Sequence, residues 1–234
     1  DGVPHFADPR HILNRVMKRF DEIGLTPVVA IEYEFYLIDQ EAAANGEIKP
    51  ARGRETGWRA STTNVYSVDE LYDFEALLDE IQQVCKEQGL PAETFVKEYA
   101  AGQYEINLHH CDDALKACDQ AILLERCIKS VARKHGVIAS FMAKPFSQQA
   151  GCGLHIHCSL LDKDGNNVFA GPMDEDINRP ISDTLRHAVG GLLQTMREGM
   201  AIFAPNAHSY RRLRPGDYAP VRGLWGGDNR TVPL

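Results

Sequence analysis

The chain has 234 residues, 44% hydrophobic and 25% charged, a balance that suits one large domain with a sizeable core. Its net charge of −8 argues against a nucleic-acid partner, because such a surface needs a basic stripe to displace counterions. No apolar run approaches the roughly 18 residues of a membrane span, no charged-then-apolar leader opens the sequence, and the six cysteines form no CxxC pair, so we expect a cytoplasmic protein with reduced thiols.

Helix and strand patterns follow each other from the start of the chain. Asp8-Pro9 is typical of an N-cap followed by proline at the first helical position, and apolar residues then recur at helical spacing until Gly24. Residues 27–38 alternate and are rich in β-branched and aromatic side chains, which predicts a strand. Residues 40–66 are polar without clear periodicity, and we expect a long loop there.

The middle of the chain repeats this alternation. Ser67 to Glu70 reads as a capping box that opens a single helix, which Gly89 closes. Residues 94–110 read as strand with an interruption at 100–102. A helix over about 113–135 and a strand over 137–143 follow.

The last third begins with an alternating strand over 153–161 and a turn at Asp164-Gly165 that leads into Val168. A final helix is predicted over about 182–200, and the chain from Pro205 onward is rich in proline, glycine and arginine. The mixed order with several hairpins predicts an α+β fold, in which helices cover an antiparallel-rich sheet.

Three of the predicted strands place their polar residues on one face, because strand side chains alternate. Glu98 would lie on the opposite face from Glu105 in an unbroken strand, and the interruption at 100–102 offers a turn or bulge to re-aim it. The residues that share faces are Glu32 with Glu34, Gln103 with Glu105 and Asn107, and His155 with His157 and Ser159.

Solvated strand faces are one reading of this pattern, and a metal site is the other. If the glutamates converge, each close pair costs roughly 4 kcal/mol at 4 Å and an effective dielectric of 20, so cations would be needed. Oxygen-rich sites with one imidazole suit Mg²⁺ or Mn²⁺. Zinc held by the segment from Cys152 to Cys158 is a weaker alternative, because Cys158 would face away from His155 and His157 on a regular strand.

Taken together, these residues resemble the glutamine synthetase superfamily, most closely the branch that makes γ-glutamylamines. The matching segments occur in family order: Glu32-Tyr33-Glu34-Phe35, Glu98 with Gly102-Gln103-Tyr104-Glu105, Phe141 to Phe146, Gly151 to His157, Ser209 to Leu213, and Asp228 to Thr231. The resemblance implies that residues 1–234 form a partial catalytic domain with a curved antiparallel-rich sheet. It further implies that an N-terminal β-grasp domain and the C-terminal end are absent.

The resemblance also implies a chemistry: an ATP-dependent ligase that joins glutamate's γ-carboxylate to an amine through γ-glutamyl phosphate. One Mg²⁺ or Mn²⁺ would be held by Glu34, Glu98 and Glu105, and another by Glu32 and His155. The remaining implied roles are ATP contact for His157 and Ser159, glutamate binding for Gly151 and Arg212, and contact with the transferring phosphoryl for Arg230. For Arg211 and Arg214 we favour a solvated loop.

Two departures from the family pattern bear on the acceptor. Ammonia-using members carry a flap glutamate six residues after the position of Arg212, where this chain has Tyr218, and Ala150 replaces a common asparagine. A phenol is a poorer base than a carboxylate at neutral pH. We therefore expect an organic amine or polyamine as acceptor, with ammonia-using glutamine synthetase and a non-catalytic structural relative as the alternatives. The family arrangement also implies a homo-oligomeric ring, a dodecamer.

Overall fold

The computed structural model describes residues 2–227, 229 and 231–234, and its centre is a five-stranded sheet. Every strand pairing in this sheet is antiparallel, which confirms the predicted α+β fold with an antiparallel-rich sheet. The strands are β1 (Thr26–Asp39), β2 (Ala92–Lys97), β3 (Gln103–Leu108), β4 (Val137–Ser140) and β5 (Leu154–Leu161).

The long strand β1 organises the sheet because it pairs with three partners. β3 lies along one edge of β1, while β5 and then β4 pair with successive parts of the opposite edge. In this register Glu34 lies opposite Glu105, and Glu32 lies opposite both Asn107 and His155. Polar residues that are up to 123 positions apart in sequence therefore meet in the middle of the sheet.

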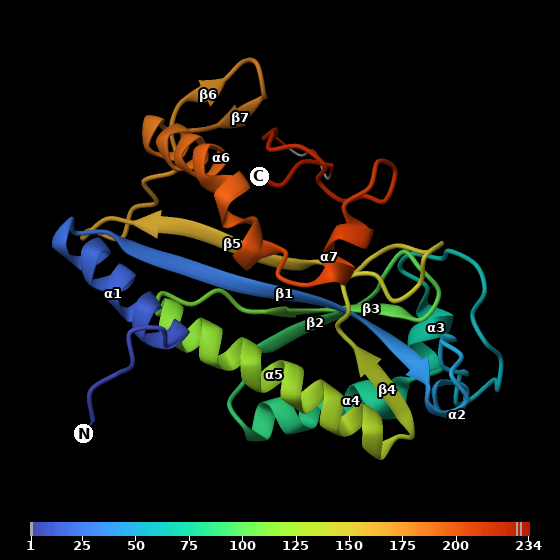
Figure 1. Ribbon diagram of the computed structural model, residues 1–234. Coiled ribbons are helices and arrows are strands. Elements are labelled where there is room, and N and C mark those ends of the chain that lie inside the picture. The colour runs from blue at the N-terminus through green and yellow to red at the C-terminus, as the bar shows by residue number, and fades with distance from the viewer. Residues whose placement is uncertain (1, 228, 230) are drawn as a thin grey trace.

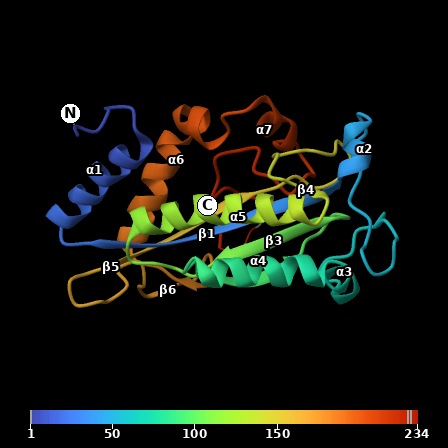
Figure 2. The same ribbon diagram turned by 90° about the horizontal axis from the view of Figure 1, so that it is seen from below.

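Helices lie on both sides of the sheet (Figure 1). α4 and α5 cover one face, where Phe35, Ile106 and Leu124 are fully buried in the main core. α6 and α7 lie on the other side, whereas α1 lies at one end of the molecule beside the start of α5, through the Arg10–Asp119 ion pair (Figure 2). The bounds are α1 (Pro9–Glu22), α2 (Gln40–Ala44), α3 (Val68–Tyr72), α4 (Glu75–Glu87), α5 (Ala114–Lys134), α6 (Asp183–Phe203) and α7 (Ala207–Arg212), with a separate small sheet of β6 (Met173–Asp174) and β7 (Arg179–Pro180).

The predicted helix starts are confirmed by side-chain caps. Asp8, Asp113 and Ser182 each accept a hydrogen bond from a backbone N–H in the first turn of α1, α5 and α6 respectively. These bonds satisfy donors that a helix N-terminus otherwise leaves unpaired. Gly24 and Gly136 end the first and third of the predicted helices with φ of +68° and +66°, a conformation that glycine adopts without steric cost.

The single helix predicted over 67–89 is wrong, because the chain forms α3 and α4 with a break at Asp73 and Phe74. The Asp73 carboxylate accepts from the backbone N and the hydroxyl of Thr56 at 3.0 and 3.1 Å, and its carbonyl accepts from Arg54 N at 2.9 Å. These bonds tie the break to the 40–66 loop. Long-range partners of Asp73 therefore override a helical periodicity that continues through this point.

Four further features differ from the sequence prediction. α2 lies within the expected loop because the Asp39 side chain caps it, accepting from Ala42 N at 2.9 Å. α7 lies within the expected C-terminal loop, and β4 ends at Ser140, three residues early. The hairpin after Asp164-Gly165 consists of an isolated bridge between Leu161 and Asn167.

The six cysteines are all free, as expected of reduced thiols. Cys85 and Cys127 are buried together in the core, with their sulfurs 3.9 Å apart. Among the described residues, none of the helices combines the length with the hydrophobicity that a membrane span requires.

Candidate functional site

Three predicted metal ligands converge where β1 and β5 pair. Glu32, Glu34 and His155 each offer one ligand atom, and these atoms lie within 4.8 Å of one another. His155 Nδ1 contacts the Glu32 carboxylate and lies 4.0 Å from Glu34 Oε1. The two-residue period of β1 places both glutamates on one face, and the antiparallel register brings His155 opposite Glu32.

Glu34 is held by two donors on one of its oxygens. Gly153 N and Gln103 Nε2 donate to Glu34 Oε2 at 2.9 and 3.0 Å. Burial, which leaves 11% of its side chain exposed, raises the pKa of Glu34, while the Gly153 N–H and the charge of His155 oppose the rise. Gln103 also donates to Gly151 O at 3.0 Å, so it links Glu34 to the loop that precedes β5.

Glu32 and Glu105 form a pair whose two pKa values move apart. Burial raises the pKa of Glu105 to about 8, and the neighbouring charge of Glu32 adds to the rise. Burial also opposes ionisation of Glu32, but hydrogen bonds and charge from His155, with a bond from His157, lower its pKa to about 2. The pKa of His155 is raised in turn by its bond to Glu32. Without a cation, Glu105 therefore keeps a proton near neutral pH.

Glu98 reaches the same region from the turn between β2 and β3, where its backbone N donates to Gln103 O at 2.9 Å. The buried Lys97 ammonium donates to the carbonyls of Glu98 and Ala100 at 2.6 and 2.8 Å and fixes this turn. The charge of Glu98 contributes to the raised pKa values of Glu34 and Glu105. The turn predicted at 100–102 is therefore present, and it brings Glu98 into electrostatic reach of the other carboxylates.

The two residues predicted to contact ATP lie further along β5. His157 Nε2 is 3.1 Å from the second oxygen of Glu32, and 63% of its side chain is exposed. Ser159 follows on the same face, opposite Val28, and is half-buried. Both side chains thus continue the polar face of His155 toward solvent.

Arg212, in the last turn of α7, packs against the loop that precedes β5. A Cβ built on Gly151 would lie 2.7 Å from Arg212 Cγ and 2.4 Å from Ala143 O, so only glycine fits there. The Nε of Arg212 is buried and has no hydrogen-bond partner among the described residues. Its charge acts on Glu34 and His155. The structure thus brings Arg212 and Gly151 together at the site, whereas Arg230 lies outside the described residues.

Sequence reasoning did not assign site roles to Gln103, Asn107 or Gly153. A Cβ on Gly153 would lie 2.8 Å from His155 Nε2 and 3.0 Å from Glu34 Oε1, which explains the glycine. Asn107 donates to Glu105 Oε1 at 3.0 Å, and its own Oδ1 is buried with no partner among the residues that the structure describes. The one feature of the sequence that could have indicated these roles is the strand face that Gln103 and Asn107 share with Glu105.

The donor set fits a hard divalent cation. It comprises crowded carboxylates, one imidazole and the unpaired Asn107 oxygen, and a cation would replace the proton on Glu105. The zinc alternative is not supported by the described residues: Cys152 is buried beside Tyr36, Cys158 faces away from His155, and neither cysteine belongs to a group of potential ligands.

The comparisons with known proteins all indicate one protein family. The model described as the glutamine synthetase catalytic domain matches residues 6–234. The chain is 42% identical over 234 residues to gamma-glutamylputrescine synthetase PuuA of Escherichia coli (strain K12), covering 100% of this chain and 48% of the relative. It is 34% identical over 232 residues to glutamate–isopropylamine ligase of Pseudomonas sp, and the match covers 99% of this chain and 49% of that relative.

A solved structure agrees with this family. A GmaS/ADP complex superposes with a TM-score of 0.84 at 29% sequence identity, covering 99% of this chain and 52% of the solved one. The chain spans about half the length of the curated relatives it matches.

Proposed function

Because the chain belongs to the glutamine synthetase family through its catalytic domain, we propose that the full-length protein is an ATP-dependent glutamate–amine ligase. It joins the γ-carboxylate of glutamate to an organic amine or polyamine through γ-glutamyl phosphate. The acceptor class is supported by the similarity to enzymes named for putrescine and isopropylamine and by Tyr218 at the position of the flap glutamate.

The convergence of Glu32, Glu34 and His155 near Arg212, whose Nε is buried, carries this proposal. In it, Glu34, Glu98 and Glu105 hold one Mg²⁺ or Mn²⁺, and Glu32 with His155 holds a second. These cations, when bound, would neutralise charge on the ATP phosphates and on the transferring phosphoryl group.

The remaining roles concern substrates. Arg212 would pair its Nε, which is buried and has no partner among the described residues, with a carboxylate of glutamate, since a buried donor left unpaired is costly. Gly151 would leave room for glutamate's backbone groups, because its position admits no side chain. His157 and Ser159 would contact ATP from the exposed end of β5, and Arg230 would contact the transferring phosphoryl.

The whole protein would work in the cytoplasm as a homo-oligomeric ring, a dodecamer. This assembly and the division into an N-terminal β-grasp domain and a catalytic domain remain predictions from the family resemblance. The mass of the purified full-length protein by analytical ultracentrifugation would test the ring.

Phosphate release by the full-length protein tests the chemistry. With ATP, Mg²⁺ and glutamate, we expect release to depend on putrescine, spermidine or a monoamine rather than on ammonium. Glu105→Ala should lower the rate by at least about 100-fold, since loss of even an outer metal-site partner costs 10- to 100-fold. Glu93→Ala is the matched control, because Glu93 lies on the neighbouring β2 and pairs with His109 at 3.3 Å, outside the cluster.

The other outcomes identify the alternatives. Release driven only by ammonium would make the protein a glutamine synthetase with an unusual flap. No release with any amine, together with thermal stability that Mg²⁺ and ATP leave unchanged, would indicate a structural relative that has lost the chemistry. Equal losses in Glu105→Ala and Glu93→Ala would refute the metal role of Glu105.

A further inference from the structure

Two tyrosine rings from distant parts of the chain meet beside the carboxylate cluster. Tyr99 lies in the turn between β2 and β3, and Tyr218 lies in the segment after α7. Their ring centroids are 5.5 Å apart with an interplanar angle of 58°. Both side chains remain accessible, at 41% and 60% exposure, so the pair forms an open aromatic surface rather than part of the core.

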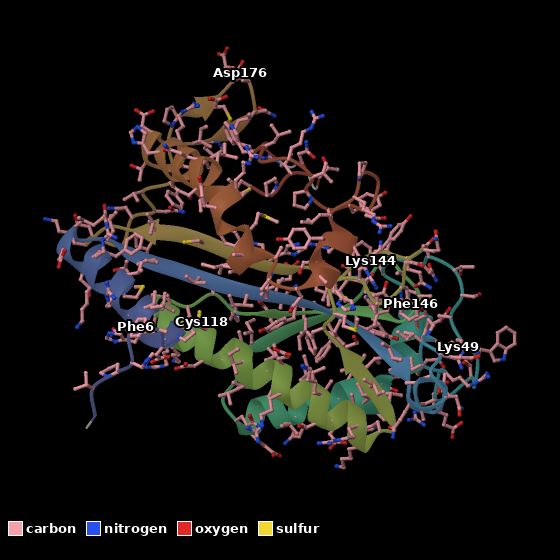
Figure 3. All side chains as sticks on the ribbon, viewed as in Figure 1. Phe6, Lys49, Cys118, Lys144, Phe146 and Asp176 are labelled. Atoms are coloured by element: carbon pink, nitrogen blue, oxygen red, sulfur yellow. The ribbon has the colours of Figure 1, made fainter. Side chains whose placement is uncertain are left out.

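The backbone holds Tyr218 in this position at an energetic cost. Its φ of +51° lies in the left-handed region, where a non-glycine residue is strained by about 1 kcal/mol or more. The preceding Asp217 is anchored by Lys144 Nζ at 2.9 Å, and the same ammonium donates to Gln149 O at 2.6 Å. Lys144, labelled in Figure 3, is only 3% exposed, so the lysine end of this ion pair is shielded from solvent.

The turn that carries Tyr99 is equally constrained. The backbone N of Tyr99 donates to Glu98 Oε2 at 2.9 Å, and Lys97 binds the carbonyl of Glu98 at 2.6 Å. The backbone of Tyr99 is therefore bound to a carboxylate that acts electrostatically on Glu34 and Glu105. On the other side of the pair, the charge of Asp217 is already neutralised by Lys144.

An open aromatic surface beside carboxylates suits an organic cation. Ring faces attract ammonium groups by about 0.5 to 2 kcal/mol, and they also cover alkyl carbons. The nitrogen that attacks an activated carboxyl must lose its proton to free a lone pair, whereas a second ammonium at the other end of the acceptor keeps its charge throughout the reaction. A lasting attraction to the ring faces therefore suits a distal ammonium.

We propose that Tyr99 and Tyr218 form the acceptor subsite that binds the alkyl chain and the distal ammonium of an aliphatic diamine. This inference rests on the proposed amine-ligase function and names its substrate class. The two tyrosines determine specificity in it: the distal ammonium lies against their ring faces, and the opposite nitrogen points toward the metal cluster.

The test uses the full-length protein with two acceptors that share a four-carbon chain, 1,4-diaminobutane and n-butylamine, of which only the first carries a second nitrogen. Wild-type kcat/KM should favour the diamine. Tyr218→Leu and Tyr99→Leu should each lower kcat/KM for the diamine by about 3- to 30-fold, mainly through KM, and should change the monoamine less. Tyr218→Phe should retain most activity because the ring face remains.

Tyr66→Leu is the matched control. Tyr66 is also an exposed tyrosine in the left-handed region, with φ +59° and 66% exposure, and its ring has no aromatic partner among the described residues. Its substitution should leave both acceptors unaffected. Equal losses in Tyr66→Leu and Tyr218→Leu, or a diamine kcat/KM within twofold of wild type in both Tyr99→Leu and Tyr218→Leu, would overturn the subsite.

A binding measurement separates the subsite from the reaction. If the unmodified protein released no phosphate with any amine, the proposed function would fail. Calorimetric titration of the unmodified protein with 1,4-diaminobutane would then test the subsite independently of the reaction. Binding that is lost in Tyr218→Leu supports the subsite, and absence of binding to the unmodified protein overturns it.

Discussion

Helices α5 and α6 share a length of 21 residues and a polar N-cap, yet they differ in how much of their surface is buried. α5 buries eight residues against the sheet and α4, whereas α6 has no buried residue. Local signals of capping and periodicity are therefore sufficient to place both helices. Burial depends on the partner surface, which α5 finds on the apolar face of β1 and β3.

The candidate site lies on the boundary between these two regions. Glu32, Glu34 and Glu105 stand on strands whose opposite face packs against α5, so these carboxylates are held rigidly. Arg212 and Tyr218 come from the segment that follows α6. Because that segment buries little apolar surface, we expect it to open locally at lower free energy than the sheet.

Truncation of one leucine in each helix should give the largest contrast. Leu124→Ala in α5 removes a fully buried side chain and should lower the free energy of unfolding by about 2–5 kcal/mol. Leu192→Ala in α6, where 44% of the residue is exposed, should change it by less than about 0.5 kcal/mol. Urea denaturation of the full-length protein measures both. A large loss in Leu192→Ala would show that α6 is covered there by another surface.

The titration of Glu105, which lies on the sheet that packs against α5, should have a smaller effect on the free energy of unfolding. Its folded pKa of about 8 lies above the ordinary 4.5, so its contribution to stability is fully present below pH 4.5 and is lost as pH rises through 8. The metal-free protein should therefore lose roughly 2 kcal/mol between pH 5 and pH 8, after allowance for screening by solvent. Thermal denaturation across this range measures the loss.

Glu105→Gln should keep only the smaller part of this decline, which comes from Glu34 and His155 because their pKa values are also raised. Saturating Mg²⁺ should cancel the decline in the unmodified protein, since a cation requires the ionised carboxylate. An unchanged slope in Glu105→Gln would assign the pH dependence to other groups.

Loss of the two helix caps should give the smallest effect. Asp113→Ala and Ser182→Ala each remove a bond to the first turn, from Lys116 N at 3.0 Å or Leu185 N at 3.1 Å, worth about 1 kcal/mol. At α5 the loss should lower global stability, because that helix unfolds only with the core. At α6 it should instead increase hydrogen exchange within the helix and leave the urea midpoint unchanged. Identical behaviour of the two variants would remove the distinction between the regions.

Local patterns in the sequence were enough to place most elements and the polar faces. The alternation of β1 put Glu32 and Glu34 on one side, and Asp8 with Pro9 marked the start of α1. These features depend on near neighbours, because a strand's period and an N-cap involve only a few consecutive residues.

Tertiary contacts decided what local patterns could not. The break at Asp73 depends on the distant Thr56, the meeting of Glu32 with His155 depends on strand register, and the fit of Gly151 depends on Arg212. In each case the energy comes from partners far away in the sequence. Such partners become neighbours only when burial of the apolar face of the sheet has fixed the register and the path of the chain.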